Sequence, residues 1–280
     1  MEQDSQLKQS YQLLMQHKII ILPILLSIIL PIIVLLFFLV FSTYNTAIEQ
    51  FVNEQLVTAD VTSAFMYFIS MLAAILFVNF YFTCMTYALI TMAVKKLPFT
   101  LATTFSKTHH YFLRFLYLRF LVMAILVTPL VILGILGFLL YNFTILLGII
   151  GLIFLPFILI AYLAYVVYIY YIFFYDTTSL YIEDTSATSA LKHSFAISKH
   201  HFRYIMVVFL IMVGFYFLMK SINQTFTLGS SLFLESSSMA LMVVGVLLLI
   251  LVVIIESIYS AFIHMYWFES YKNLEDGTHS

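Results

Sequence analysis

Six long apolar stretches constrain the fold of this chain more than any other feature of its sequence. About 20 apolar residues in a helix cross the hydrocarbon core of a membrane. Helices suit these stretches because lipid offers no partner to an exposed backbone N–H or C=O group. The stretches are Ile19–Phe41, Ser63–Val94, Phe115–Tyr141, Ile145–Tyr175, Tyr204–Ile222 and Met239–Phe268. We therefore predict an all-α membrane protein with six transmembrane helices.

The scarcity of charge supports the same class. Only 9% of the 280 residues are charged and 64% are hydrophobic, whereas soluble domains carry about 25% charged residues. Such a chain cannot cover a globule with polar surface, so lipid is its main solvent. The formal net charge of -1 gives no reason to expect nucleic acid as a partner. The predicted partners are membrane lipids, with other membrane proteins as further candidates.

The distribution of Lys and Arg predicts the orientation. When the connections are assigned to alternating sides, all of the 12 Lys and Arg except Lys220 lie on the side of the N-terminal tail. The positive-inside rule places that side in the cytoplasm. We therefore predict cytoplasmic N- and C-termini and a location in the plasma membrane. The opposite connections carry the acids Glu49, Glu54, Asp60 and Glu235.

Three cytoplasmic segments resemble one another. The N-terminal tail around Tyr11, residues 98–114 around Phe105 and residues 184–203 around Phe195 carry apolar residues at helical spacing among polar ones. Each precedes two apolar stretches, which predicts three tandem hairpins, each preceded by an amphipathic interfacial helix. The single domain 1–280 would then contain pseudo-repeats 1–97, 98–183 and 184–280. Convergent composition at a basic membrane boundary is the alternative explanation.

The third of these segments supplies the predicted membrane-surface contacts. Leu191–His201 is expected to be helical, with Asp184 or Thr185 as its cap. Basic residues seven apart share a helix face that can reach anionic headgroups, while the aromatic residue between them points into acyl chains. The predicted contacts are Lys192, Phe195, Lys199 and Arg203.

Glu256 lies within the sixth apolar stretch and marks the candidate intramembrane polar site. A carboxylate at that depth is unfavourable by a few kcal/mol unless it is paired or protonated. Ser260 and His264 follow four and eight residues later and share its helix face. A proton or substrate site, a structural hydrogen bond to another helix, and a hydrated carboxylate near the headgroups are all compatible with Glu256. Asn79, within the second stretch, completes the candidate site, although such amides more often join helices.

Motifs for catalysis and metal binding are absent from the sequence. The pairs His109-His110 and His200-His201 point about 100° apart on a helix, and neither Cys nor clustered carboxylates complete a ligand set. The chain contains no Walker loop, no His-Glu-x-x-His and no Gly-x-Ser-x-Gly. We predict no catalytic residue, no metal and no cofactor, and hence a protein that is not an enzyme.

One region of the sequence resembles a known family. Leu180-Tyr181-Ile182-Glu183-Asp184 is followed by Ser189-Ala190-Leu191-Lys192-His193-Ser194-Phe195, and then by Lys199 and Phe202-Arg203. This pattern resembles the glycerophosphoryl diester phosphodiesterase membrane-domain family and related prokaryotic multi-pass families. The resemblance implies a six-span membrane part and assigns no activity. The enzyme activity in the family's name needs a soluble barrel of about 250 residues, and no stretch outside the membrane is long enough for one.

Three functional classes remain for this sequence. The first is a protein that handles or transports a lipid or another amphiphile. The second is a non-catalytic scaffold or accessory subunit that acts through its basic cytoplasmic face. Sparse intramembrane charge argues against an ion-coupled pump, and an intramembrane enzyme is the least favoured class. A lipid-accessible cavity that contains Glu256 would favour the first class, and a solid bundle would favour the second.

Overall fold

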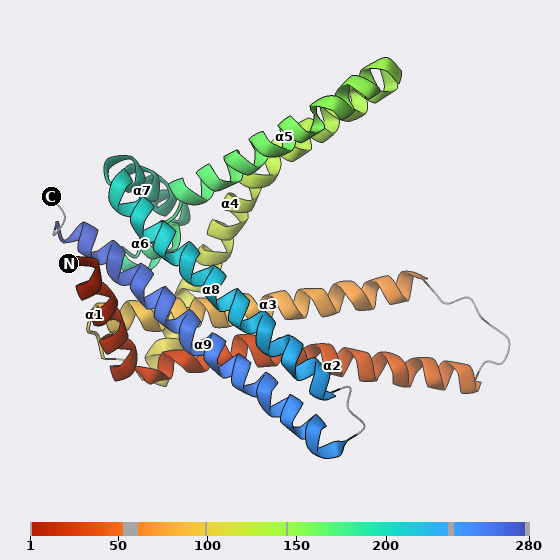
Figure 1. Cartoon of the computed structure of the whole chain (residues 1–280), viewed down its shortest axis with the longest axis horizontal. Helices are drawn as coiled ribbons and strands as arrows, with labels where there is room; N and C mark the ends of the chain where they lie inside the picture. The colour runs from red at the N-terminus through yellow and green to blue at the C-terminus, as the bar shows by residue number, and fades with distance from the viewer. Residues whose placement is uncertain (1, 53–60, 99, 144, 235–237, 278–280) are drawn as a thin grey trace. The chain divides into compact units, whose positions relative to one another are not determined.

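The computed structural model describes residues 2–52, 61–98, 100–143, 145–234 and 238–277, and these form helices without any strand. This confirms the predicted all-α class. The elements, drawn in Figure 1, are α1 (Glu2–Gln16), the short 3-10 helix η1 (Lys18–Ile20), α2 (Ile21–Val52), α3 (Val61–Val94), α4 (Leu101–Phe143), α5 (Ile145–Ile172), α6 (Asp176–Ile182), α7 (Ala187–His200), α8 (Phe202–Leu234) and α9 (Met239–Glu275).

Six of these helices are long and apolar enough to cross a membrane. Each corresponds to one of the predicted stretches, so the chain is a multi-pass membrane protein. Several helices exceed the hydrocarbon thickness of about 30 Å: α4 has 43 residues and α9 has 37, or about 65 and 55 Å of helix. The acids Glu54, Asp60 and Glu235, which contributed to the predicted orientation, lie outside the described residues.

The start of α4 differs from the prediction. Residues 98–114 were expected to form a separate interfacial helix, but Leu101–Phe143 is continuous. Thr100 and Thr103 cap the start of this helix with two reciprocal hydrogen bonds. The Thr103 N–H donates to the Thr100 hydroxyl at 3.3 Å, and the Thr100 N–H donates to the Thr103 hydroxyl at 2.8 Å. No Gly or Pro follows before Pro129, so nothing in this sequence ends the helix before it enters the apolar stretch.

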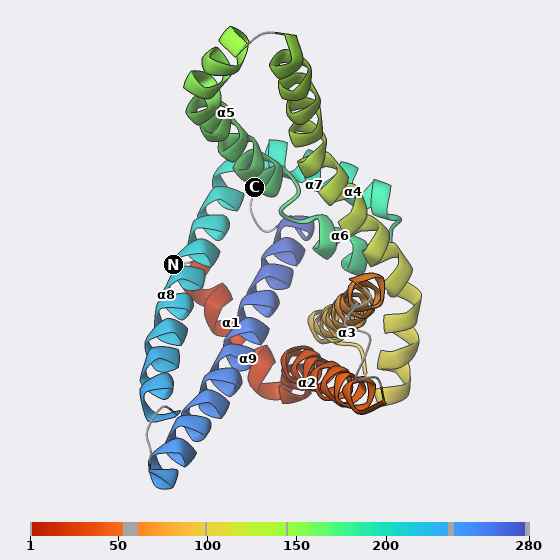
Figure 2. The ribbon, with the colours of Figure 1, turned by 90° about the vertical axis from the view of Figure 1, so that its right-hand side faces the viewer.

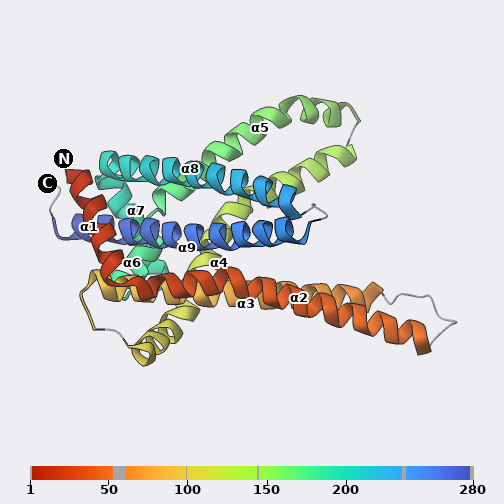
Figure 3. The ribbon, with the colours of Figure 1, turned by 60° about the horizontal axis from the view of Figure 1, so that its bottom comes forward.

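The chain divides into two compact units. Unit 1 consists of Met1–His109 and Phe215–Glu269, and unit 2 of His110–Gly214 and Ser270–Ser280. Within unit 1, α2 and α3 run side by side (Figure 3), and the parts of α8 and α9 that belong to it form a second pair (Figure 2). Within unit 2, the α4–α5 hairpin packs around a small apolar core of Val122, Leu126 and Ile169.

The three resembling segments share a burial pattern. The central aromatic residue of each segment is about half exposed: Tyr11 is 51%, Phe105 is 49% and Phe195 is 48% exposed. The residue before each of these aromatic residues is small, polar and buried. The residue three positions after it is also buried; it is a leucine in the first segment and a small polar residue in the other two. These buried residues are Ser10 and Leu14, Thr104 and Thr108, and Ser194 and Ser198. Each segment therefore places an exposed aromatic residue next to buried small or apolar residues, while the repeat and its division into three hairpins stay predictions.

Candidate functional site

Polar side chains from α3 and α9 meet at a cavity of about 250 Å³ in unit 1. All four residues of the predicted intramembrane site contribute to it: Glu256, Ser260 and His264 from α9, and Asn79 from α3. The sequence pattern therefore located residues that the fold brings together. The described residues that line it are Ile24, Ser27, Ile28, Asn79, Thr83, Thr86, Tyr87, Glu256, Ser260 and His264.

The α9 side of the cavity is a polar stripe. Glu256, Ser260 and His264 lie on successive turns and extend about 12 Å along the helix axis, at 1.5 Å per residue. The Glu256 side chain is exposed, whereas Ser260 and His264 are half-buried. The cavity is therefore not sealed at its Glu256 end, and the polar groups continue from there toward the C-terminal end of α9.

Glu256 accepts a hydrogen bond from a residue that the sequence analysis did not single out. Asn223 Nδ2, on α8, donates to Glu256 Oε2 at 3.1 Å. The Thr227 hydroxyl donates to Asn223 Oδ1 at 3.1 Å, which directs the Asn223 amide NH₂ toward the carboxylate. The fifth apolar stretch was predicted to end at Ile222, but α8 continues to Leu234. Asn223 consequently lies within a membrane-spanning helix, and the partner of Glu256 is an amide rather than a basic side chain.

Aromatic rings hold the His264 end of the cavity. The Tyr87 ring meets the His264 ring edge-on, with centroids 5.2 Å apart, and stacks against Phe268 at 5.6 Å. Trp267 also contacts both Tyr87 and His264. Such ring pairs stabilise a packed arrangement beyond simple burial, so the imidazole is positioned by its surroundings.

The cavity offers one carboxylate, one imidazole, one primary amide and several hydroxyls. Among the described residues that line it there is neither Lys nor Arg, so a neutral or cationic group fits it better than an anionic one. Within the described part of the chain, no group of three or more His, Cys, Asp and Glu is arranged to hold a metal ion. The site can bind and orient a polar group through hydrogen bonds to these side chains.

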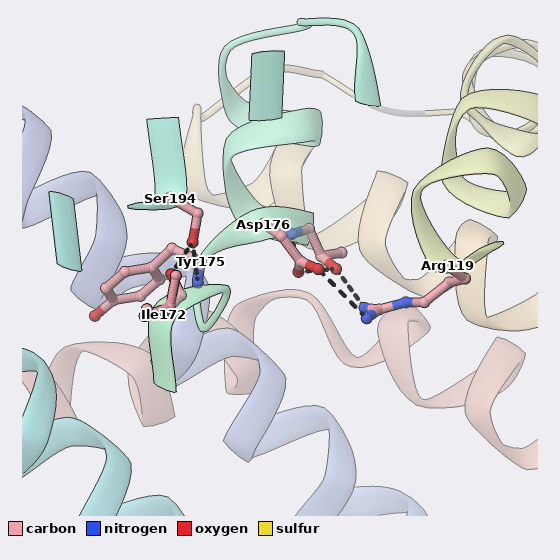
Figure 4. A network of polar contacts seen from close by, with 6 residues as sticks. Arg119, Ile172, Tyr175, Asp176 and Ser194 are labelled. Atoms are coloured by element: carbon pink, nitrogen blue, oxygen red, sulfur yellow. Dashed lines mark hydrogen bonds and ion pairs between the residues drawn. The ribbon is translucent and has the colours of Figure 1, made fainter. Parts of the chain in front are cut away.

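Unit 2 contains a separate buried polar network (Figure 4). Arg119 of α4 lies 3.6 Å from the carboxylate of Asp176, the first residue of α6, and also donates to the Thr177 hydroxyl. The Asp176 side chain is only 4% exposed and that of Arg119 is 30% exposed. This ion pair links α6 to α4. Its two residues lie far apart in the sequence, so no local pattern predicts the pair.

Ser194 of α7 binds the backbone of the turn between α5 and α6 (Figure 4). Its hydroxyl donates to the Ile172 carbonyl at 3.0 Å and accepts from the Tyr175 N–H at 3.1 Å. The Tyr175 hydroxyl lies 3.0 Å from that of Ser270. These bonds satisfy backbone groups that the break between α5 and α6 frees, which favours a structural role for the network.

Two adjacent acids after α6 have opposite pKa shifts. Burial raises the pKa of Glu183, and this outweighs the lowering by His193, with which Glu183 forms an ion pair. Partial burial would also raise the pKa of Asp184, but His110, at 3.4 Å, and Arg114, at 2.9 Å, outweigh it and hold that pKa below its usual range. Both acids are therefore committed to basic partners within unit 2.

The predicted cap of α7 is wrong. Ser186, rather than Asp184 or Thr185, is the N-cap, and its hydroxyl accepts from the Ser189 N–H at 3.3 Å. Asp184 instead has a φ of 55°, a left-handed conformation that Asp tolerates better than most residues. The chain turns at Asp184, and its side chain is directed to Arg114.

The four predicted membrane-surface residues lie on two elements of unit 2. Lys192, Phe195 and Lys199 are on α7, Arg203 is in the first turn of α8, and all four are exposed. Phe195 and Lys199 line a second pocket, while Lys192 and Arg203 lie outside it. Helix formation over Leu191–His200 is confirmed, because α7 spans Ala187–His200; its position in the membrane interface stays a prediction.

Comparison with family models, with curated proteins and with solved structures found no match to this chain.

Proposed function

We propose that this multi-pass membrane protein binds the polar headgroup of an amphiphile in the Glu256 cavity and moves that amphiphile within or across the membrane. The observation that carries the proposal is the convergence of Glu256, Ser260, His264 and Asn79 on one cavity in otherwise apolar helices. Polar groups inside membrane spans are unfavourable and usually serve function.

The dimensions of the cavity favour a headgroup over a whole lipid. Its volume of about 250 Å³ lies below the roughly 300–1,000 Å³ of sites that enclose drug-sized molecules. Because the Glu256 side chain is exposed, a headgroup can enter laterally while its acyl chains stay in the bilayer. The absence of Lys and Arg from the described lining residues favours a headgroup with an amine or hydroxyl donor, such as that of phosphatidylethanolamine.

The alternative proposal is a scaffold or accessory subunit. It draws support from the Asn223–Glu256 hydrogen bond, which is the kind of contact that a purely structural carboxylate makes, and from the exposed basic residues of α7. Under this alternative the cavity holds ordered water and nothing is moved. The two proposals differ in whether lipid crosses a bilayer that contains the protein.

Further parts of the proposal concern location and relationship. We place the protein in the plasma membrane with both termini in the cytoplasm, where the positive-inside rule puts the basic connections. The cavity would then lie in the cytoplasmic half of the spans, since Ser27 is near the start of α2 and His264 is nearer the end of α9. Kinship with the glycerophosphoryl diester phosphodiesterase membrane-domain group, without catalysis, is also proposed.

Lipid movement in reconstituted vesicles tests the proposal. Vesicles would contain phosphatidylethanolamine labelled with a dithionite-sensitive fluorophore on its acyl chain, so that only lipid reaching the outer leaflet is bleached. Wild-type protein should expose inner-leaflet lipid faster than protein-free vesicles do. Glu256→Gln keeps an acceptor for Asn223 but removes the charge, and it should slow this exposure at least about ten-fold.

The matched control is Glu275→Gln, at the exposed end of the same helix. It makes the same chemical change outside the cavity and should leave the rate unchanged. If wild-type vesicles expose lipid no faster than protein-free vesicles, the transport proposal is wrong and the scaffold is favoured. Equal rates for wild type and Glu256→Gln would remove Glu256 from the site.

A further inference from the structure

A second pocket, of about 450 Å³, lies where α5, α7 and the start of α8 meet in unit 2. Its walls are mostly aromatic: Tyr168 and Tyr171 from α5, Phe195 from α7 and Phe202 from α8. Of the described residues that line it, Lys199 alone carries a charged side chain. This volume lies within the usual range of ligand sites.

Hydrogen bonds fix the walls of this pocket. The Tyr171 hydroxyl donates to the Phe202 carbonyl at 3.2 Å, and the Ser198 hydroxyl donates to the Ile172 carbonyl at 2.9 Å. The Tyr171 and Phe202 rings also meet edge-on, with centroids 5.3 Å apart. The shape of the pocket therefore results from tertiary contacts between three helices, which a merely exposed aromatic surface would lack.

The charge of Lys199 is available to a ligand. Among the described residues, no carboxylate lies within ion-pair distance of it, and none lines the pocket. The acids Asp176, Glu183 and Asp184 of unit 2 are instead paired with Arg119, His193 and Arg114. A long Lys side chain can lie along aromatic surface and present its ammonium group at headgroup level.

We infer that this pocket binds one anionic phospholipid, with Lys199 on the headgroup phosphate and an acyl chain against Phe195 and Phe202. Both phenyl rings are about half exposed and offer the apolar surface that an acyl chain needs. Basic pockets between helices at the cytoplasmic side of a membrane favour anionic headgroups. The site is in the other unit from the Glu256 cavity and does not rest on the transport proposal.

Titration of delipidated protein with phosphatidylglycerol or phosphatidylcholine, followed by native mass spectrometry, tests this inference. Wild-type protein should bind phosphatidylglycerol more tightly than phosphatidylcholine. Lys199→Gln should weaken phosphatidylglycerol binding about five-fold and leave phosphatidylcholine binding nearly unchanged. Phe195→Ala should weaken the binding of both lipids, because it removes surface for the acyl chain.

Lys192→Gln is the matched control, since it removes the same charge from the same helix outside the pocket. It should leave both affinities unchanged. Equal weakening by Lys192→Gln and Lys199→Gln would mean that diffuse surface charge attracts the lipid, and the pocket would be rejected. Displacement of bound phosphatidylglycerol by soluble glycerol phosphate would also overturn the inference, because a free phosphate would then suffice.

Discussion

The two Arg–Asp pairs of unit 2 allow a direct comparison of a buried and an exposed ion pair. Arg119–Asp176 has side chains 30% and 4% exposed, and Arg114–Asp184 has side chains 39% and 48% exposed. Asp→Asn at either position removes the charge and keeps the shape. Removing one partner of a buried pair costs about 3–5 kcal/mol because the other charge stays uncompensated, whereas exposed pairs contribute about 0–1 kcal/mol.

Asp176→Asn should therefore lower the free energy of unfolding by about 3 kcal/mol, the low end of the buried range, since Arg119 is partly exposed and can be hydrated. Asp184→Asn should lower it by no more than about 1 kcal/mol. Asn at position 184 also tolerates the left-handed φ of 55° found there, so no backbone strain enters the control.

Far-UV circular dichroism of detergent-purified protein, recorded while SDS is added, reports the unfolding of each variant. Asp176→Asn should unfold at clearly lower SDS content than both wild type and Asp184→Asn. A loss for Asp176→Asn no larger than that for Asp184→Asn would refute the assignment of the buried pair as the link between α4 and α6.

Three further predictions follow from individual residues. A Cβ atom added at Gly245 would lie 2.9 Å from the Leu234 side chain, whereas a Cβ atom added at Gly229 would have no neighbour within 4 Å. Gly229→Ala should therefore stabilise its helix by up to about 1 kcal/mol, and Gly245→Ala should give no such gain. Unfolding of both variants by SDS measures the difference. Because the pKa of Glu183 is raised by folding, Glu183 favours the folded state most at pH values below its ordinary pKa of 4.5, and this contribution falls as the pH rises through the raised pKa. Glu183→Gln should make that fall in the free energy of unfolding smaller, as measured by unfolding titrations at several pH values. Because native Cys84 is buried, single cysteines can test the orientation: Asn142→Cys should react with an impermeant reagent in intact cells and Lys107→Cys should not, and the reverse result would invert the topology.

The sequence could identify part of the cavity because the relevant signals are local. Glu256, Ser260 and His264 are polar residues at a spacing of four in an apolar stretch, and helical geometry alone puts them on one face. Asn79 was detectable as an amide deep in another stretch. That α3 and α9 bring these residues to one cavity depends on packing between helices far apart in the sequence, which hydropathy does not encode.

Other features depended on tertiary contacts and were beyond the sequence. Asn223 follows the point where hydropathy falls, and only the continuation of α8 places it opposite Glu256. Arg119 and Asp176 are not neighbours on any helix, so their pairing has no periodic signature. The continuous α4 was mispredicted because polar residues at its start were interpreted as a separate element, although no residue there ends a helix.

The acids of this chain differ in how they are neutralised, and that difference bears on function. Asp176, Glu183 and Asp184 each face a basic side chain. Glu269 is buried and accepts a hydrogen bond from the amide of Gln9. Glu256 has an amide partner and also lines a cavity. The amide partner orients the Glu256 carboxyl group without placing a basic side chain beside it, so this group faces a space that a ligand can occupy. This is the physical ground for placing function at the Glu256 cavity rather than in the Arg119–Asp176 network.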